Sequence, residues 1–282
     1  MIVQHNMTAL NANRQLGITV GQVAKSTEKL SSGYRINRAG DDAAGLSISE
    51  KMRGQIRGLE QASTNAQDGV SLIQTAEGAL NEIHSIVQRM RELTVQAAND
   101  TNVSIDRMSI AKEIFALTSE ITRIGNQTEF NTMKLLDGSF GKTGADKKLQ
   151  VGANSGQQIN IKIDAMTASA IGITDAKVGS VIAKASATSD NISSILDIMD
   201  QALSKVSTQR SALGAIQNRL EHTIANADNV AENLTDAESR IRDVNMADEM
   251  VQFSKNNILQ QAGQSMLAQA NQSTQGVMSL LQ

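Results

Sequence analysis

The chain has 282 residues and contains no proline. Proline ends or kinks a helix because it lacks a backbone N–H and its ring clashes with the preceding turn, so a chain without it permits very long helices. The aromatic side chains are only four phenylalanines and one tyrosine. Leu, Ile, Val, Met and Ala must therefore build the core, which favours long helices with narrow apolar stripes over a globular domain.

Apolar residues recur at heptad spacing along three segments of the chain. They are Met52, Leu59, Ala66, Ile73, Leu80 and Val87 in the first, Ile110, Ile114, Leu117, Ile121 and Ile124 in the second, and Ile192, Met199, Val206, Leu213, Leu220, Ala227, Leu234 and Ile241 in the third. Sustained heptads place one apolar stripe along each helix, and that stripe must be buried against a partner. We predict a mainly α fold with helices at about 44–99, 104–129 and 191–238, packed as an elongated, coiled-coil-like bundle.

Residues 139–190 break this helical pattern. Apolar residues alternate at Leu149 and Val151 and again at Ile159, Ile161 and Ile163, on either side of an Asn-Ser-Gly sequence. Alternation around such a turn predicts a small β-hairpin within about 139–175. The stretch "SVIAKASATSD" at 180–190 is small and polar and is predicted to be a loop. The insert is too short for a large middle domain.

The two ends of the chain share an unusual composition. Apolar residues are spread through a background rich in Gln, Asn, Ser and Ala, namely Ile2, Ala9, Leu16, Val23 and Leu30 near the start and Ile258, Leu259, Met266, Leu267, Val277, Leu280 and Leu281 near the end. No charged residue occurs from Asn256 to Gln282. Such segments have too little apolar mass to fold alone. We expect the two ends to pair as helices and to become ordered on assembly; the alternative is a disordered tail.

Composition excludes several classes of function. The net charge is −3, so no global basic field favours binding to nucleic acid or to an anionic membrane. There is no cysteine, which excludes thiol chemistry, disulfides and thiolate metal sites. No apolar run approaches the roughly 18 residues that a membrane-spanning helix needs. The N-terminus lacks a basic leader followed by an apolar block, so export would require a route without a cleavable signal.

Motifs that carry catalytic or cofactor chemistry are also missing. The stretch "GSFGKT" at 138–143 hints at a phosphate-binding loop, but Leu136 stands where that loop needs a glycine. His5, His84 and His222 are far apart and form no metal-binding pair. We therefore predict a protein that is not an enzyme, with no cofactor and no metal.

The stretch "RINRAGDDAAGLSISEKM", residues 35–52, contains the densest cluster of charge. Arg35 and Arg38 precede the adjacent carboxylates Asp41 and Asp42. Paired acids in a glycine loop are able to hold a divalent cation or to act in acid–base catalysis. Because nearby arginines compete for the carboxylates, we favour a metal-free joint between two helices, held through Arg35, Arg38 or a neighbouring copy.

Four stretches resemble bacterial flagellin. They are "LSSGYRINRAGDDAAGLSISEKMRGQIRGLEQASTNAQDG", "VQRMRELTVQAAN", "QTEFNTMKLLDG" and "ILQQAGQSMLAQANQSTQGVMSLLQ". The resemblance is colinear and covers about 1–140 and 190–282. Related proteins at the hook–filament junction tend to have a proline directly after the Asp-Asp pair, whereas this chain has Ala43, which favours the filament subunit. The short insert resembles minimal flagellins without the variable outer domains.

The resemblance implies a subunit of an extracellular helical filament used for swimming. Residues 1–43 and 239–282 would form the terminal helical domain that lines the filament core and is disordered in the monomer, and residues 44–238 the surrounding rod. It also implies type III export, an export chaperone, a filament cap protein and hook-associated junction proteins as partners. Alternatives are a hook–filament junction protein, or an exported translocator or adhesin whose ends insert into a membrane.

The resemblance further implies recognition by the host Toll-like receptor that senses flagellin. The positions that match the bound patch are Gln88, Arg89, Leu93 and Glu113. Arg89 and Leu93 are four residues apart and share a helix face. The alternative is that Leu93 only widens the core stripe and that Arg89 pairs with Glu92 or with the next subunit.

Overall fold

The computed structural model describes residues 6–140, 147–183 and 189–280. The chain divides into two compact units. One, here called the terminal unit, combines Met1–Ile56 with Glu232–Gln282, and the other, here called the rod unit, comprises Arg57–Ala231. The mainly α fold with long paired helices and small antiparallel strand pairs, as predicted from the sequence, is confirmed.

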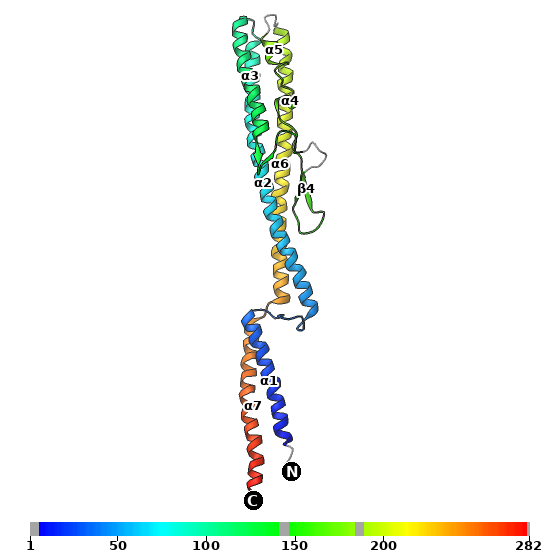
Figure 1. The fold of residues 1–282 in the computed structure, drawn as a ribbon, viewed down its shortest axis with the longest axis vertical. Coiled ribbons are helices and arrows are strands. Elements are labelled where there is room, and N and C mark those ends of the chain that lie inside the picture. Colours follow the sequence, from blue (N-terminus) through cyan, green and yellow to red (C-terminus); the bar gives the residue numbers. More distant parts are fainter. Residues whose placement is uncertain (1–5, 141–146, 184–188, 281–282) are drawn as a thin grey trace. The chain divides into compact units, whose positions relative to one another are not determined.

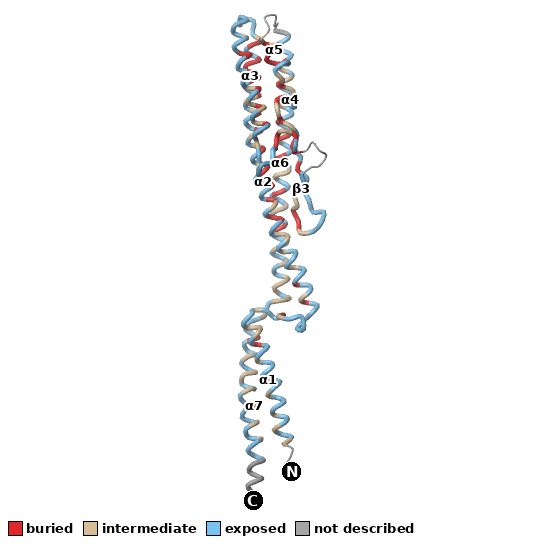
Figure 2. Tube along the Cα trace, viewed as in Figure 1, coloured by how far each residue is buried: buried red, intermediate tan, exposed pale blue. Residues whose placement is uncertain are grey.

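Three long helices form the framework of the rod unit. They are α2 (Ala43–Ala97), α3 (Ser104–Gln127) and α6 (Ser189–Arg242), and their bounds lie within a few residues of the predicted ones (Figure 1). Within the rod unit the heptad stripes meet in one core (Figure 2). Its fully buried members include Ile73, Leu80, Val87, Ile114, Ile121, Met199, Val206, Leu213 and Leu220, each 0% exposed. The apolar stripes predicted from the heptads are therefore the core.

Short elements cover one side of this helical core. The short hairpin pairs two strands of two residues each, β1 (Glu129–Phe130) and β2 (Met133–Lys134). The longer hairpin pairs β3 (Lys147–Gln150) with β4 (Gln158–Ile161). The longer hairpin is the predicted one, with Leu149 opposite Ile159. Gly69 of α2 allows its close approach, because a Cβ at Gly69 would collide with the Leu149 side chain.

Two single-turn helices, α4 (Ala168–Ile171) and α5 (Gly179–Ile182), were not predicted. The loop predicted over 180–190 is wrong at its start, since α5 reaches Ile182 and residues 184–188 lie outside the described part. The reason is burial: Ile171 and Ile182 insert into the core, 1% and 0% exposed. Four residues carry too little periodicity for sequence analysis to detect a helix.

The terminal unit is built around a second helix pair. Helices α1 (Met7–Ser32) and α7 (Met246–Leu280) run side by side in opposite directions, so the start of α1 lies beside the later turns of α7 (Figure 1). The Asn6 amide Nδ2 donates to the Ala270 carbonyl at 3.0 Å and ties the start of α1 to α7. None of the helices in the described residues is long and apolar enough to cross a membrane.

The predicted domain boundaries, 43/44 and 238/239, lie close to the connections between helices. The division by packing instead falls inside α2 and α6, at 56/57 and 231/232. Within the terminal unit, the first turns of α2 are bonded to the end of α6, where Ser49 Oγ donates to Glu238 Oε1 at 2.8 Å.

Replacing Ile83 tests the packing of the rod unit. Ile83 lies on α2 and is 0% exposed, so Ile83→Ala should lower the free energy of unfolding by about 2–5 kcal/mol through lost burial and a residual cavity. Urea denaturation followed by circular dichroism measures this loss. The control is Glu82→Ala, on the exposed side of the same helix turn. An equal loss of unfolding free energy in both variants would contradict the assignment of Ile83 to the buried face of α2.

Candidate functional site

The pair of α1 and α7 has almost no core of its own. Ser26 is the one residue of α1 that is buried, among those described. Leu16, Val23 and Leu30, the predicted contact residues of α1, are only half-buried. Leu16 faces Gly263 of α7, where an added Cβ would lie 3.4 Å from Leu16 Cδ1. One helix partner therefore covers only part of the apolar surface of α1.

Many apolar side chains of this pair remain uncovered. They are Met7, Leu10, Ile18 and Val20 on α1 and Met246, Met250, Val251, Ile258, Leu259 and Met266 on α7, all between 43% and 69% exposed. We call this set the terminal apolar surface. Apolar side chains gathered along a helix pair in such number mark a surface that binds another protein.

The terminal apolar surface includes three of the predicted assembly residues. Ile258, Leu259 and Met266 are 67%, 46% and 62% exposed. Ile2 and Leu281 lie outside the described residues, as does the side chain of Leu280.

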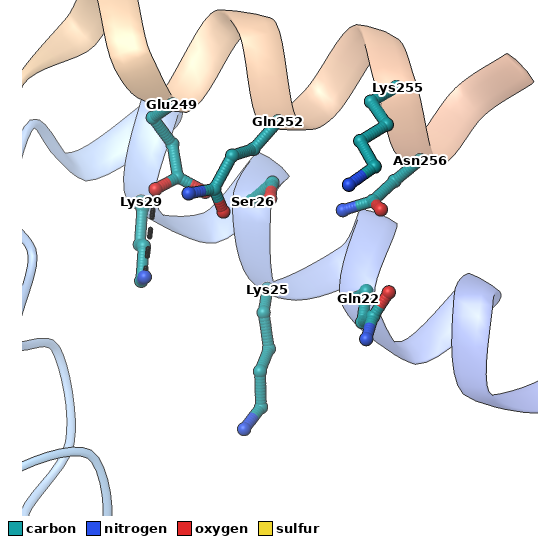
Figure 3. A pocket seen from close by; sticks show the side chains of 8 residues that line it. All are labelled: Gln22, Lys25, Ser26, Lys29, Glu249, Gln252, Lys255 and Asn256. Atoms are coloured by element: carbon teal, nitrogen blue, oxygen red, sulfur yellow. Dashed lines mark ion pairs between the residues drawn. The ribbon is translucent and has the colours of Figure 1, made fainter. Parts of the chain in front are cut away.

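A polar hollow of about 420 Å³ lies between α1 and α7 near the joint (Figure 3). Its charged lining consists of Lys25, Lys29 and Lys255 with Glu249. The Glu249 carboxylate is buried, with its side chain 8% exposed, and pairs with Lys29 Nζ at 3.6 Å. The lysines outnumber the carboxylate, so the hollow presents net positive charge.

The connection from α1 to α2 is bonded to the connection from α6 to α7. Gly33 ends α1 in the left-handed region, at φ 75°, where glycine adopts the backbone without strain. The Gly33 carbonyl accepts from Val244 N at 3.0 Å, and Arg35 N donates to the Arg242 carbonyl at 2.6 Å. These backbone bonds join residues more than two hundred positions apart in sequence and fix the two connections to each other.

Side chains reinforce the same joint. The Arg242 guanidinium lies over the Tyr34 ring, 4.7 Å from its centroid, a favourable cation–π contact. Arg242 also approaches Glu238 and Ser49, at 4.0 and 3.5 Å. Sequence analysis missed Tyr34 and Arg242. The available signal was that Tyr34 is the single tyrosine in the chain.

Asp41 and Asp42 do not pair with the side chains of Arg35 and Arg38, which corrects that part of the prediction. Asp41 Oδ2 accepts from the backbone N of Arg38 at 3.0 Å and of Asn37 at 3.3 Å. Asp42 Oδ1 accepts from Gly45 N at 2.9 Å, which makes Asp42 the N-cap of α2. The carboxylates are satisfied by nearby backbone amides, which need less side-chain ordering than an ion pair.

The two arginines have other partners. Arg38 Nε pairs with Glu28 Oε1 of α1 at 3.0 Å, and the Arg35 guanidinium donates to the carbonyls of Arg240 and Ile241. Arg35, Arg38, Asp41 and Asp42 thus all lie in the joint. The two carboxylates accept hydrogen bonds from backbone amides, and the two arginine side chains contact the ends of α6 and α1. No group of three or more potential metal ligands occurs among the described residues.

The pKa of Asp41 is lowered from its ordinary value of 3.8, chiefly because the Arg38 N–H donates to its carboxylate. Lys25 and Lys29 contribute through their charge. A carboxyl group with a lowered folded-state pKa stabilises the fold above its unfolded pKa, and that stabilisation is lost as the pH falls through the folded value. Asp41 therefore supports the joint at neutral pH and ceases to do so in acid.

The predicted receptor residues are only partly brought together at the surface. Arg89 donates from Nε and Nη2 to Glu113 Oε1 of α3, both at 3.1 Å, and from Nη1 to Glu92 Oε2 at 3.2 Å. These bonds, that to Glu113 most of all, raise the pKa of Arg89. Gln88 lies beside this cluster and bonds to His84 at 3.0 Å.

Leu93 is 2% exposed and belongs to the core. Leu93 therefore lies in the core stripe, as the alternative expected, while its part in receptor binding stays a prediction. The reason is geometric: Leu93 follows Met90 by three residues on α2, so both face α3 and α6.

Comparisons with known proteins agree on one family. Residues 3–141 match the model of the bacterial flagellin N-terminal helical region, and residues 196–281 match that of the bacterial flagellin C-terminal helical region. A flagellin from Halalkalibacterium halodurans is 56% identical over 281 residues, and one from Bacillus subtilis is 55% identical over 304 residues. Each alignment covers 100% of both chains.

Solved structures are similar at lower identity. A flagellar hook-associated protein from Vibrio parahaemolyticus is 15% identical, has a TM-score of 0.60 and matches 72% of this chain and 100% of its own. That likeness concerns the fold alone. The crystal structure of Bacillus cereus flagellin is 31% identical, has a TM-score of 0.48 and covers 58% of this chain and 88% of its own.

Replacing Asp42 tests the joint. Asp42→Ala removes the N-cap of α2 and should lower the free energy of unfolding by about 1 kcal/mol. Urea denaturation measures the loss, with Asp68→Ala on the exposed face of α2 as the control. Addition of calcium or EDTA should leave the wild-type unfolding curve unchanged. A curve that calcium shifts upward and EDTA shifts back would establish a metal site instead.

Proposed function

The chain belongs to the bacterial flagellin family, and from this premise we propose how its two units divide the work of a filament subunit. It is a structural subunit of the flagellar filament, an extracellular polymer of copies of itself that serves motility.

We assign the terminal helices to the inner core of the filament. The supporting observation is the terminal apolar surface, which the α1–α7 pair leaves uncovered although it needs burial. In a filament, the terminal helices of neighbouring copies would cover it. Residues 1–43 and 239–282 would then be poorly ordered in the monomer and would become ordered on assembly, because a pair with so few buried residues gains little free energy by itself.

Residues 44–238 would form the layer around that core. The heptad core of the rod unit supports this assignment, because it is buried within one copy and does not depend on a neighbour. In the described residues between α3 and α6, 128–140 and 147–183, the elements are short hairpins and single-turn helices, which fits a subunit without outer domains.

The joint would transmit the arrangement of the core to the outer layer. Within one chain, backbone hydrogen bonds between Gly33 and Val244 and between Arg35 and Arg242 hold the α1–α2 connection to the α6–α7 connection. A subunit built this way would move its two connections as one body when neighbouring copies shift.

Further partners follow from membership of the family and stay proposals. The partners would be an export chaperone on the C-terminal segment, a filament cap protein and hook-associated junction proteins. Export would follow the type III route, without a cleavable signal. As a member of a family of structural proteins, the chain would take no catalytic part. The fold likeness to a hook-associated protein favours a junction subunit as the second candidate, but identity to flagellins is far higher.

Host recognition is proposed on a revised patch. Arg89 of α2 bonds to Glu113 of α3, and Gln88, next to Arg89 in sequence, bonds to His84 instead. Leu93 would support the patch from the core, since it is buried. Arginine is common among residues that dominate binding energy, and Arg89 is half-exposed, with its side chain 52% exposed.

Charged substitutions on the terminal apolar surface test the assembly proposal. The double variant Ile258→Asp with Met266→Asp should abolish filament formation while leaving the circular dichroism of the monomer unchanged, because both side chains are exposed in the single chain. Electron microscopy after seeding with short filaments is the measurement. Ser254→Asp, on an exposed polar position of α7, is the control. Normal filaments from the double variant would refute the proposal.

Arg89→Ala tests the receptor patch. The binding free energy of the monomer for the purified receptor ectodomain should weaken by at least ~1–2 kcal/mol. Calorimetry measures this change. Arg91→Ala is a matched control, because Arg91 lies on the same helix but pairs with Asp200 of α6, Nε to Oδ1 at 2.8 Å. Intact filaments should bind less receptor than monomers. Equal affinity of both variants and wild type would rule the patch out.

A further inference from the structure

An apolar groove lies on the rod unit where α2, the short hairpin and the longer hairpin meet. It has a volume of about 300 Å³ and is lined by Asp68, Gly69, Leu72, Phe130, Met133, Phe140, Lys147, Lys148, Leu149 and Ile161. Leu72, Phe140 and Ile161 are buried at its floor, while Met133 is 38% exposed at its edge. Apart from Asp68 and the two lysines the lining is aliphatic, aromatic or thioether, so the groove suits apolar side chains.

The same unit carries an apolar projection elsewhere. Val103, Ile105 and Met108, at the connection from α2 to α3 and the start of α3, are 60%, 73% and 48% exposed. We call these three residues the tip. Ile105 is more exposed than any other large apolar residue in the described part of the chain. Among the described residues of the rod unit, packing leaves Ile105 largely exposed to solvent.

The tip of one chain does not reach the groove of the same chain. The groove lies against Asp68–Leu72 of α2, and the tip follows the end of that helix at Ala97. From Leu72 to Ala97 the helix rises about 38 Å at ~1.5 Å per residue. Because one rigid helix separates the two features, any contact between them joins two copies.

An open helical polymer needs such a pair of unlike surfaces. A head-to-tail interface that does not close joins one patch to a different patch on the next copy. We propose that the tip of one copy seats in the groove of the next, with Ile105 and Met108 inserted between Phe130, Met133 and Leu149. This contact would join rod units and rests on the assignment of the chain as a filament subunit; it is separate from the terminal apolar surface.

The charges around the two surfaces are complementary. Lys147 and Lys148 at the groove are exposed and outnumber Asp68. At the tip, the Asp106 carboxylate is exposed on the first turn of α3, and the side chain of Asp100 is 82% exposed. Arg107 Nη2 pairs with Asp100 Oδ1 at 3.2 Å and offsets part of the Asp100 charge, while the Arg107 side chain itself is mostly covered, 13% exposed. Asp106 is therefore the main acidic group at the tip. Opposite charges at the rim favour this pairing of copies over groove-to-groove contact.

Cross-linking tests the contact directly, because the chain has no cysteine of its own. The double variant Ile105→Cys with Met133→Cys is assembled into filaments under reducing conditions and then treated with a short bis-maleimide. Denaturing gels should show a ladder of dimers, trimers and longer products. The control variant Ser85→Cys with Met133→Cys places the first thiol on an exposed position of α2 away from the tip and should show no ladder.

A single substitution gives an independent measurement. Ile105→Asp should raise the critical concentration for polymerisation at least about tenfold, with the monomer's circular dichroism unchanged because the side chain is exposed. Ser109→Asp, an exposed polar position on the same helix, should change it little.

The outcomes separate this contact from the function of the chain. Filaments that form from the double-cysteine variant without a ladder, or with the same ladder in the control, overturn the tip-to-groove contact and leave the filament assignment intact. An unchanged critical concentration for Ile105→Asp also overturns it. Failure of the wild-type chain to form filaments would instead count against the filament assignment.

Discussion

Burial of one narrow apolar stripe per helix is the constraint on which the structure depends. In α2, α3 and α6 the stripes are continuous and face one another, so Ile73, Leu80 and Leu213 reach full burial within a single copy. The hairpins and the single-turn helices extend this core by a few residues each. A core of aliphatic side chains on long helices provides stiffness along the helices without the bulk of a globular domain.

Helix α1 has apolar residues at seven-residue spacing and α7 has dispersed ones, but the two helices lack the apolar mass to complete a core. Leu16 and Val23 are half-buried against α7, while Ile258 and Met266 remain exposed. The two units therefore differ in how much of their apolar surface they bury within a single copy. The rod unit satisfies its apolar stripes internally, and the terminal unit leaves a surface exposed in the single copy, which suits a subunit that polymerises with copies of itself.

The joint between the helix pairs is stabilised mainly through the backbone. Asp41 and Asp42 accept backbone N–H groups, Arg35 donates to backbone carbonyls, and Gly33 provides the left-handed turn. Tyr34 and Arg242 add a cation–π contact. Bonds of this kind fix the direction of the chain at the joint, whereas exposed side-chain ion pairs such as Arg38 with Glu28 contribute little to stability.

Sequence alone determined the long helices and their core, because heptad spacing and the absence of proline leave few other ways to bury Leu80 or Val206. The family followed from the resemblance of four stretches to flagellin. It also located the joint at residues 35–42. Tertiary structure decided which partners the joint residues take, since Asp41, Asp42, Arg35 and Arg38 have several partners within reach and spacing does not rank them. It buried Leu93, because whether a residue beside a stripe is covered depends on where α3 and α6 lie. It also brought Leu149 and Phe130 together into a groove, which no local pattern encodes, because these residues come from separate hairpins and meet only once both pack on α2.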